Sequence, residues 1–438
     1  MKKSILIAFL ILLTSIMPVF AMSITYKDTP QAYDSPVILS QFDKDKDGIN
    51  SIDSVKDIYI CFYGAGKSFY EMFGHVSIIV RYDNNNEDTY DYGVFNPRSK
   101  GFLSNVLHGF MFYELYRQVN RYSLQNKMEI TERSIRYYRL KGLAPDKKED
   151  ISKFLKYNYS EYRRKYLYHF FNDNCSTRIR DILDKAYDGK LSEIGKRPYG
   201  SERTAIETQI SPYPLTEMLY GIAGGSVMDR EISYYDAMFL PSILEYALDE
   251  IGAGEFDSKN DWNVKYDYNA NFETKTSSWT PLIYIALIFA LLNVIFKIAF
   301  TMKYSKVTIR FYALINSIVL LVIFVISLCM CYMQLYTIID CSWYNENTIF
   351  INPLILVPLV EMLMMLFSKT SVKFRTLNKL ISYQGIFFTL LALLALLLKP
   401  LLPYQANTVQ IVSFLVYYLS LIDYYGIYKK ITRKHKAK

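Results

Sequence analysis

Hydrophobic and polar positions divide the chain into two parts of different character. The first part alternates short apolar runs with polar and glycine-containing turns, a pattern typical of a folded α+β domain. The second part is dominated by apolar stretches at residues 279–300, 311–335, 349–367, 380–398 and 408–428. Each is close to the roughly 20 residues that cross a bilayer core, so the pattern predicts five transmembrane helices.

The first residues predict export. Lys2 and Lys3 precede an uncharged apolar run at residues 5–20, and Val19 and Ala21 place small residues at the two positions that a signal peptidase reads. We therefore expect residues 1–21 to be a signal peptide cleaved after Ala21. An uncleaved signal anchor is the alternative.

Charge orients the predicted membrane part. Residues 281–438 hold fifteen Lys and Arg against four Asp and Glu, and the basic residues gather in two loops and in the tail at 429–438. Since such loops stay on the cytoplasmic side, the C-terminus is expected in the cytoplasm, and residues 22–278 on the outer side of the membrane. The formal net charge of +8 thus reflects membrane topology. No nucleic-acid partner is expected, because the exported part carries no basic excess.

Two features of the chain leave alternatives open. Glu361 falls inside the third predicted span, where a carboxylate is either functional or engaged in a hydrogen bond between helices. In the segment 22–56, Asp43, Asp45 and Asp47 alternate before Gly48, as at the start of a calcium loop. The closing position holds Ser54 in place of a bidentate glutamate, so the segment is either a weak structural Ca²⁺ site or a solvated acidic turn.

Residues 57–278 are expected to form the domain that carries the chemistry. The pattern predicts strands at 57–63, 73–82 and 89–95, with a hairpin tip at 83–88. His75 stands at the start of one strand. Asp91 or Tyr92, on the neighbouring strand, could orient its imidazole.

The main candidate for catalysis is Cys175. Asn174 precedes an apolar-periodic run and is a typical N-cap residue, which places Cys175 in the first turn of a helix whose buried stripe contains Ile179, Ile182 and Leu183. The unpaired amides and the helix dipole at that position favour a thiolate, the nucleophilic form of cysteine. A nearby histidine would complete the activation.

The alternatives for this cysteine are a buried structural thiol and a disulfide with Cys61. Among the histidines, His75 has the strand position that a base needs and is preferred to His169. His108 lies in an apolar turn, and His435 falls on the cytoplasmic side. Histidine and cysteine show no zinc-ligand spacing, so metal catalysis is not expected.

Three segments together resemble a known family. They are 73–77 (Phe-Gly-His-Val-Ser), 90–95 (Tyr-Asp-Tyr-Gly-Val-Phe) and 172–178 (Asn-Asp-Asn-Cys-Ser-Thr-Arg), and 239–244 (Phe-Leu-Pro-Ser-Ile-Leu) is similar to the family's closing segment. They resemble the periplasmic domain of Lnb-type lipoprotein N-acyltransferases. The motif order is also similar to that of circularly permuted papain-like (NlpC-like) enzymes. The resemblance implies a permuted papain-like α+β domain followed by the five-helix bundle of residues 279–428.

The resemblance also implies an activity and its partners. The thiolate of Cys175 would take an acyl chain from a phospholipid or other diacylglyceryl donor as a thioester, and the acceptor would be the α-amino group of a lipoprotein's N-terminal lipidated cysteine. His75 would act as acid and base, with Asp91, or Tyr92 as rival, holding its tautomer. The amide of Cys175 and the Asn174 side chain would stabilise the oxyanion, unless Asn174 is only a cap. No cofactor is required.

Two other functions remain open. A membrane-tethered hydrolase could use the same Cys175 and His75 to cut peptide or cell-wall amides. A non-catalytic scaffold would instead have Cys175 disulfide-bonded or inaccessible. The outer loop after the second span departs from the expected family pattern, because no histidine lies near Asp340. Trp343 and Tyr344 in that loop suit an interfacial anchor.

Overall fold

The computed structural model contains two compact units. The helical unit comprises Met1–Lys27, Tyr213–Asp229 and Ser277–Lys438, and the α+β unit comprises Asp28–Pro212 and Arg230–Thr276. The structure describes residues 35–45, 54–66, 71–96, 98–118, 133–210, 213–257, 280–302, 305–368, 370–401 and 405–425. The predicted signal peptide, Asp47 and the basic tail lie outside these residues, and so do the last residues of the fifth predicted span.

The α+β unit is built on a seven-stranded antiparallel sheet with the order β6-β4-β3-β2-β1-β5-β9. The strands are β1 Val55–Tyr63, β2 His75–Tyr82, β3 Glu87–Val94, β4 Phe112–Gln118, β5 Ile135–Leu140, β6 Lys165–Leu167 and β9 Gly254–Phe256. The three predicted strands and their hairpin are confirmed. In that hairpin Arg81 pairs with Glu87.

Both faces of the central strands are buried. Val76, Ile78 and Val80 of β2 are fully buried on one face. The other face carries a separate apolar cluster of Tyr59, Cys61, Tyr63, Ile79, Ile135 and Tyr137. Strands that are covered on both sides read as nearly continuous apolar runs, which explains the sequence of β1 and β2.

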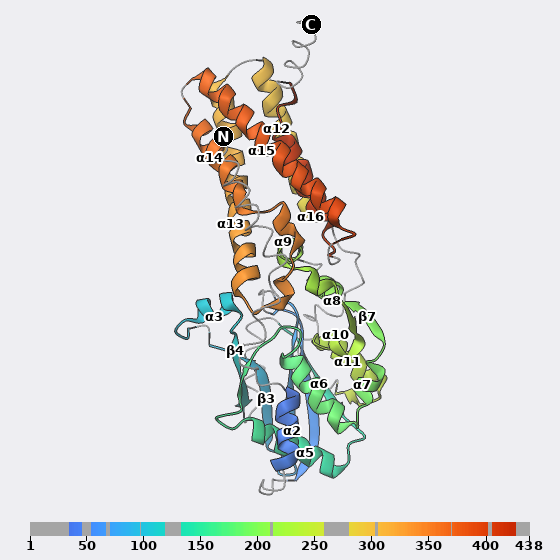
Figure 1. Ribbon diagram of the computed structural model, residues 1–438. Coiled ribbons are helices and arrows are strands. Elements are labelled where there is room, and N and C mark those ends of the chain that lie inside the picture. Colours follow the sequence, from blue (N-terminus) through green and yellow to red (C-terminus); the bar gives the residue numbers. More distant parts are fainter. Residues whose placement is uncertain are drawn as a thin grey trace. The chain divides into compact units, whose positions relative to one another are not determined.

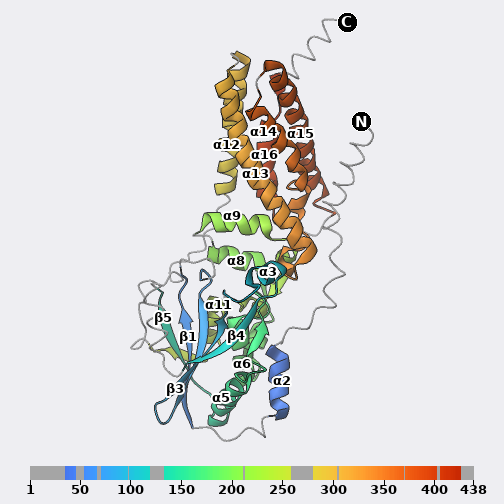
Figure 2. The same ribbon diagram turned by 90° about the vertical axis from the view of Figure 1, so that its left-hand side faces the viewer.

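Helices α5 Pro145–Asn158 and α6 Cys175–Ala186 pack on this sheet (Figures 1 and 2). Helix α6 contacts β2 and β3 through the predicted stripe, in which Ile179 and Leu183 are fully buried. The unit also contains a two-stranded sheet of β7 Pro198–Ser201 and β8 Glu231–Ser233. The remaining helices are α2 Ser35–Asp45, α3 Phe102–His108, α7 Lys190–Ile194, α8 Glu202–Ile210, α10 Tyr234–Ala237 and α11 Pro241–Glu250.

Among the described residues, four helical segments are long and apolar enough to cross a membrane: Pro281–Ala299, Lys306–Tyr336, Glu346–Leu366 and Val372–Leu398. They correspond to α12 Thr280–Met302, α13 Lys306–Tyr336, α14 Leu356–Leu366 with the turns before it, and α15 Ser371–Leu398. Large apolar side chains such as Leu291, Ile318 and Leu390 are exposed on them, as expected for a lipid-facing surface.

The fifth predicted span is not confirmed. Helix α16, Thr408–Ser420, has 13 residues, and at about 1.5 Å per residue it is shorter than the apolar core of a bilayer. Glu361 lies half-buried on α14. Its Oε2 has no hydrogen-bond partner among the described residues, so the structure supports no interhelical hydrogen bond from that oxygen.

Buried amide side chains attach helix α9, Pro214–Ala223, to the helical unit. Nδ2 of Asn345 donates to the carbonyl oxygens of Ile222 and Ala223, at 2.8 and 2.9 Å. Nε2 of Gln405 donates to the carbonyl oxygen of Gly224 at 2.8 Å. These bonds satisfy carbonyls at the end of α9, which explains why Tyr213–Asp229 clusters with the helical unit although the sequence assigns it to the exported domain.

The buried stripe of α6 should contribute strongly to the stability of the α+β unit, because it packs on β2 and β3. Leu183→Ala removes a fully buried side chain, and we expect it to lower the free energy of unfolding by about 2–5 kcal/mol. The measurement is a urea titration of the purified chain, followed by hydrogen exchange in peptides of β1 and β2. Lys185→Ala, at an exposed position of the same helix, is the control and should cost less than about 1 kcal/mol. Equal effects would contradict the packing role.

Candidate active site

Asn174 fixes the start of helix α6 and therefore the position of Cys175. Its Oδ1 accepts hydrogen bonds from the backbone N–H groups of Ser176 and Thr177, at 2.8 and 2.9 Å. Oγ1 of Thr177 in turn accepts the N–H of Asn174 at 2.8 Å, which completes a capping box. Cys175 is the first residue of the helix and is partly exposed. It therefore has the helix-start position expected of a nucleophile.

Strands β2 and β3 supply the partners of the thiol. Nε2 of His75 lies 2.7 Å from Oδ1 of Asp91, and the two side chains are 19% and 13% exposed. Burial alone would lower the pKa of His75, but the charges of Asp91 and Cys175, with hydrogen bonds to both, raise it to about 10. The imidazole is therefore protonated at neutral pH. Because Nε2 faces Asp91, Nδ1 is the nitrogen left for the sulfur.

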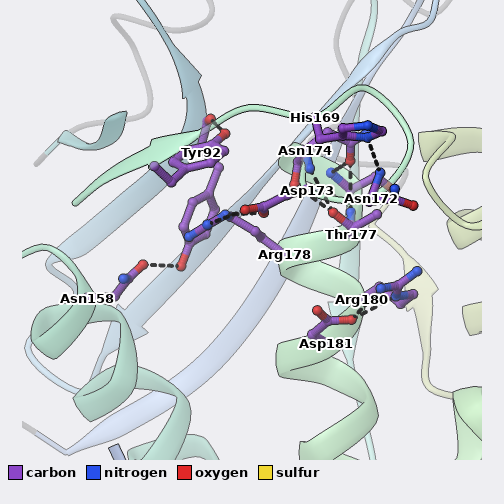
Figure 3. Close-up of polar contacts among 12 residues, drawn as sticks. Tyr92, Asn158, His169, Asn172, Asp173, Asn174, Thr177, Arg178, Arg180 and Asp181 are labelled. Atoms are coloured by element: carbon purple, nitrogen blue, oxygen red, sulfur yellow. Dashed lines mark hydrogen bonds and ion pairs between the residues drawn. The ribbon is translucent and has the colours of Figure 1, made fainter. Parts of the chain in front are cut away.

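The structure separates the two residues that the sequence offered as partners of the imidazole. Asp91 contacts His75, whereas the hydroxyl of Tyr92 donates to Oδ1 of Asn158 on α5, at 2.8 Å (Figure 3). Successive residues of a strand point to opposite faces of a sheet, so both could not reach the same ring. The prediction that Tyr92 could orient the imidazole is therefore corrected. Tyr92 is a buried packing residue, and its ring lies under the guanidinium of Arg178.

Asn174 is occupied as a cap. Its Nδ2 donates to the carbonyl oxygens of Phe170 and Phe239, at 2.7 and 2.9 Å. Both N–H groups of the amide are thus engaged, which leaves no side-chain donor for an oxyanion. The cap alternative fits this geometry, and an oxyanion role for Asn174 stays a prediction without a free donor.

A buried ion pair holds the loop before Cys175. Nε and Nη2 of Arg178 donate to Oδ1 and Oδ2 of Asp173, at 2.6 and 2.7 Å, in a bidentate pair (Figure 3). The guanidinium of Arg178 also lies over the ring of Tyr166, 3.7 Å from its centroid. This pair connects the loop, helix α6 and the sheet. It therefore restricts the position of Cys175, which lies between Asp173 and Arg178 in the sequence.

The other candidates among the cysteines and histidines are placed elsewhere. Nδ1 of His169 accepts backbone N–H groups of Phe171 and Asn172, so this nitrogen serves the loop (Figure 3). Nδ1 of His108 contacts the carbonyl oxygen of Ser104. Cys61 and Cys175 form no disulfide bond. The structure therefore brings Cys175, His75 and Asp91 together and leaves the alternatives apart.

The possible calcium site is only partly described. Asp43 and Asp45 lie at the end of α2, where Asp43 pairs with Lys185, and Asp45 accepts the hydroxyl of Tyr157. No group of three or more potential metal ligands occurs among the described residues. Since Asp47 lies outside those residues, the Ca²⁺ site stays a prediction.

Two positions beside the imidazole were not identified from the sequence. The ring of Tyr63 stacks on His75, with centroids 5.4 Å apart. Gly93 lies against the same ring, since a Cβ at that position would be 2.4 Å from Cε1 of His75. Its N–H also donates to Oδ1 of Asp91 at 2.7 Å. The glycine two residues after the carboxylate, in Asp91-Tyr92-Gly93, was the available signal.

Gly93→Ala should separate the histidine from its partners. The added methyl group would displace the imidazole, so we expect Cys175 to react with iodoacetamide about tenfold more slowly or worse, while the fold is retained. The measurement is the alkylation rate by mass spectrometry. Gly142→Ala is the control for a glycine substitution away from the imidazole, since its new Cβ meets no atom within 4 Å and only its φ of 70° causes strain. An unchanged rate in Gly93→Ala would contradict the contact.

The raised pKa of His75 makes stability depend on pH. Because its folded-state pKa, about 10, exceeds the ordinary 6.5, proton binding by His75 stabilises the folded chain fully below about pH 6.5. The contribution is lost as pH rises towards about 10. The unfolding midpoint of the wild type should therefore exceed that of His75→Gln most at about pH 6 and least at about pH 10. A difference between the two midpoints that stays constant or grows from pH 6 to pH 10 would refute this prediction. His108→Gln is the control.

A comparison with known proteins identifies the kind of domain that carries these residues. Residues 42–208 match the family model described as the Lnb N-terminal periplasmic domain. No curated protein and no solved structure matches the chain, so the permuted papain-like relationship stays a prediction. The matched range contains His75, Asp91 and Cys175 together with the strands and the helix that position them. Residues 42–208 thus belong to the family of Lnb N-terminal periplasmic domains, and candidate membrane helices follow them in the sequence.

Proposed function

We propose that the protein is a membrane-anchored N-acyltransferase that acylates the α-amino group of the N-terminal lipidated cysteine of lipoproteins through a thioester on Cys175. The observation that carries this proposal is the hydrogen-bonded group of Cys175, His75 and Asp91 inside an Lnb periplasmic domain. A thiol at a helix start beside an oriented imidazolium is the resting form of a thiol nucleophile.

In the first half-reaction the thiolate of Cys175 attacks an ester carbonyl of a phospholipid or other diacylglyceryl donor. A sulfur–carbon bond forms, and the electron pair of the C=O bond moves to the oxygen. When this intermediate collapses, the ester carbon–oxygen bond breaks and the leaving alkoxide takes the proton of His75. The products are a lyso lipid and an acyl thioester on Cys175.

In the second half-reaction the lipoprotein amine attacks the thioester. The neutral imidazole of His75 accepts the proton that the amine loses, and the sulfur leaves as thiolate, which restores the starting state. A thioester suits this step because amines attack it more readily than they attack an oxygen ester. Asp91 keeps the ring oriented through both half-reactions, since its carboxylate binds Nε2.

The candidate membrane helices support a lipid substrate. Donor and acceptor both carry acyl chains that reside in a bilayer, and the described part of the protein contains four helical segments able to enter one. We place the protein in the bacterial inner membrane with the Lnb domain in the periplasm. The basic loops between the predicted spans and the basic tail favour a cytoplasmic C-terminus, because Lys and Arg accumulate on the cytoplasmic side of a membrane.

The thioester is the decisive intermediate. We expect incubation of the purified chain with phospholipid to give an acyl adduct on Cys175 that hydroxylamine removes, and Cys175→Ala to abolish it. The measurement is intact-mass and peptide mass spectrometry, with Cys329→Ala as a matched control that keeps the adduct. Full activity of Cys175→Ala without any adduct on the wild type would exclude the mechanism.

The acceptor is tested in cells. Lipoproteins from cells that produce the wild type should carry an N-terminal amide-linked acyl chain that is lost when Cys175→Ala replaces it. Unaltered lipoproteins together with shortened peptidoglycan stems would instead favour a cell-wall hydrolase that uses the same thiol.

A further inference from the structure

Arg133 lies at the same end of the sheet as His75. In the sheet register Tyr63, the last residue of β1, pairs with His75 on one side and with Ile135 on the other. Arg133 comes two residues before Ile135, and the N–H of Gly64 donates to the carbonyl oxygen of Ser134 at 3.0 Å. Residues two apart on a strand share a face, so this register directs Arg133 to the face that carries His75.

The guanidinium of Arg133 is buried but only partly satisfied. Its residue is 5% exposed, and its Nε donates to the carbonyl oxygen of Gly64 at 2.8 Å. Nη1 forms an ion pair with Oε1 of Glu71 at 3.6 Å, which is longer than a hydrogen bond. Nη2 finds no hydrogen-bond partner among the described residues. A buried donor without an acceptor destabilises a fold, so its presence in the structure is consistent with a ligand that accepts its hydrogen bond.

The guanidinium also interacts electrostatically with the groups of the candidate site. Burial lowers the pKa of Arg133, and Glu71, Tyr63, Cys175 and Asp91 act on it in the opposite direction. Cys175 and Asp91 are thus within electrostatic reach of the guanidinium. No donor is left on the Asn174 side chain, because its two N–H groups serve Phe170 and Phe239. Arg133 therefore retains, among the described residues, an unused charged donor within electrostatic reach of Cys175.

We propose that Nη2 of Arg133 binds an anionic oxygen of the acyl donor beside Cys175. Two oxygens have this chemistry: the phosphodiester of a phospholipid, and the ester oxygen that becomes negative when the thiolate attacks. This inference rests on the proposed function. Arg133 donates N–H groups to the oxygen and keeps its proton throughout, so the bonds made and broken remain those at Cys175 and His75. Arginine suits the role because it stays charged when it is buried.

The experiment compares two donors in Arg133→Gln. One is phosphatidylethanolamine, and the other is a p-nitrophenyl fatty ester, which has no phosphate. The rate and extent of Cys175 acylation are followed by intact-mass spectrometry. Arg139→Gln is the matched control, since Arg139 lies on β5 but is exposed and paired with Glu255. Arg133→Lys keeps the charge and should recover part of the lost activity.

The two anionic oxygens give different results. If Arg133 binds the phosphodiester, Arg133→Gln should raise the KM for the phospholipid about tenfold or more and leave the nitrophenyl ester unaffected. If it binds the developing oxyanion, acylation at saturating donor should slow by roughly 10²-fold or more with both donors. Unchanged kinetics with both donors would overturn the inference. So would a loss that is matched by Arg139→Gln or accompanied by slower iodoacetamide labelling of Cys175.

A binding measurement separates this inference from the proposed function. In a Cys175→Ala background, dihexanoyl phosphatidylglycerol and dihexanoylglycerol are titrated into chains with Arg133 or Gln at position 133. If the wild type forms no thioester with either donor, the proposed function fails and this titration alone decides the inference. Phospholipid binding weakened about tenfold by Arg133→Gln supports a phosphodiester site. Equal binding excludes the phosphodiester and overturns the inference unless Arg133→Gln also slows acylation with both donors.

Discussion

The hydrogen bonds that cap helix α6 are the constraint on which the candidate active site depends. A cysteine gains nucleophilic character at a helix start only if the first turn is held in place, because the amides of that turn must point at the sulfur. Asn174 holds it with both ends of its amide, and the Asp173–Arg178 pair fixes the loop that leads into it. The site thus places its reactive atom on a rigid element, and its polar side chains serve mainly to position that element.

The partners of the sulfur come from a different part of the fold, and glycine makes their approach possible. His75 and Asp91 belong to adjacent antiparallel strands, so their distance is set by the sheet register and not by a loop. Tyr63 covers one face of the imidazole. Gly93 of β3 leaves room for the imidazole, because it has no Cβ. Burial in this setting would lower the pKa of an isolated imidazole and favour its neutral form. The carboxylate and the sulfur reverse that tendency.

Local patterns predicted the elements and the reactive residues, whereas long-range pairing decided their roles. The hairpin, the capped helix and the stripe of Ile179 and Leu183 follow from period and capping chemistry. Asp91 and Tyr92 could not be separated beforehand, because the face on which each lies depends on strand pairing. Arg133 carries no local signal, since its partners are 60 or more residues away in the sequence. The fifth span is not confirmed, because an apolar stretch does not specify how much of it is helical.

The charges around His75 explain how one side chain can serve as acid and then as base in the proposed reaction. At rest Asp91 and Cys175 both raise the pKa of the imidazole. Acylation converts the sulfur into a neutral thioester and removes the contribution of Cys175. Burial, which lowers the pKa of His75, then meets less opposition, so the ring that gave its proton to the leaving alkoxide is disposed to remain neutral. A neutral imidazole beside a thioester is the base that an incoming amine requires. When the amine displaces the sulfur, the thiolate returns and the imidazolium is stabilised again.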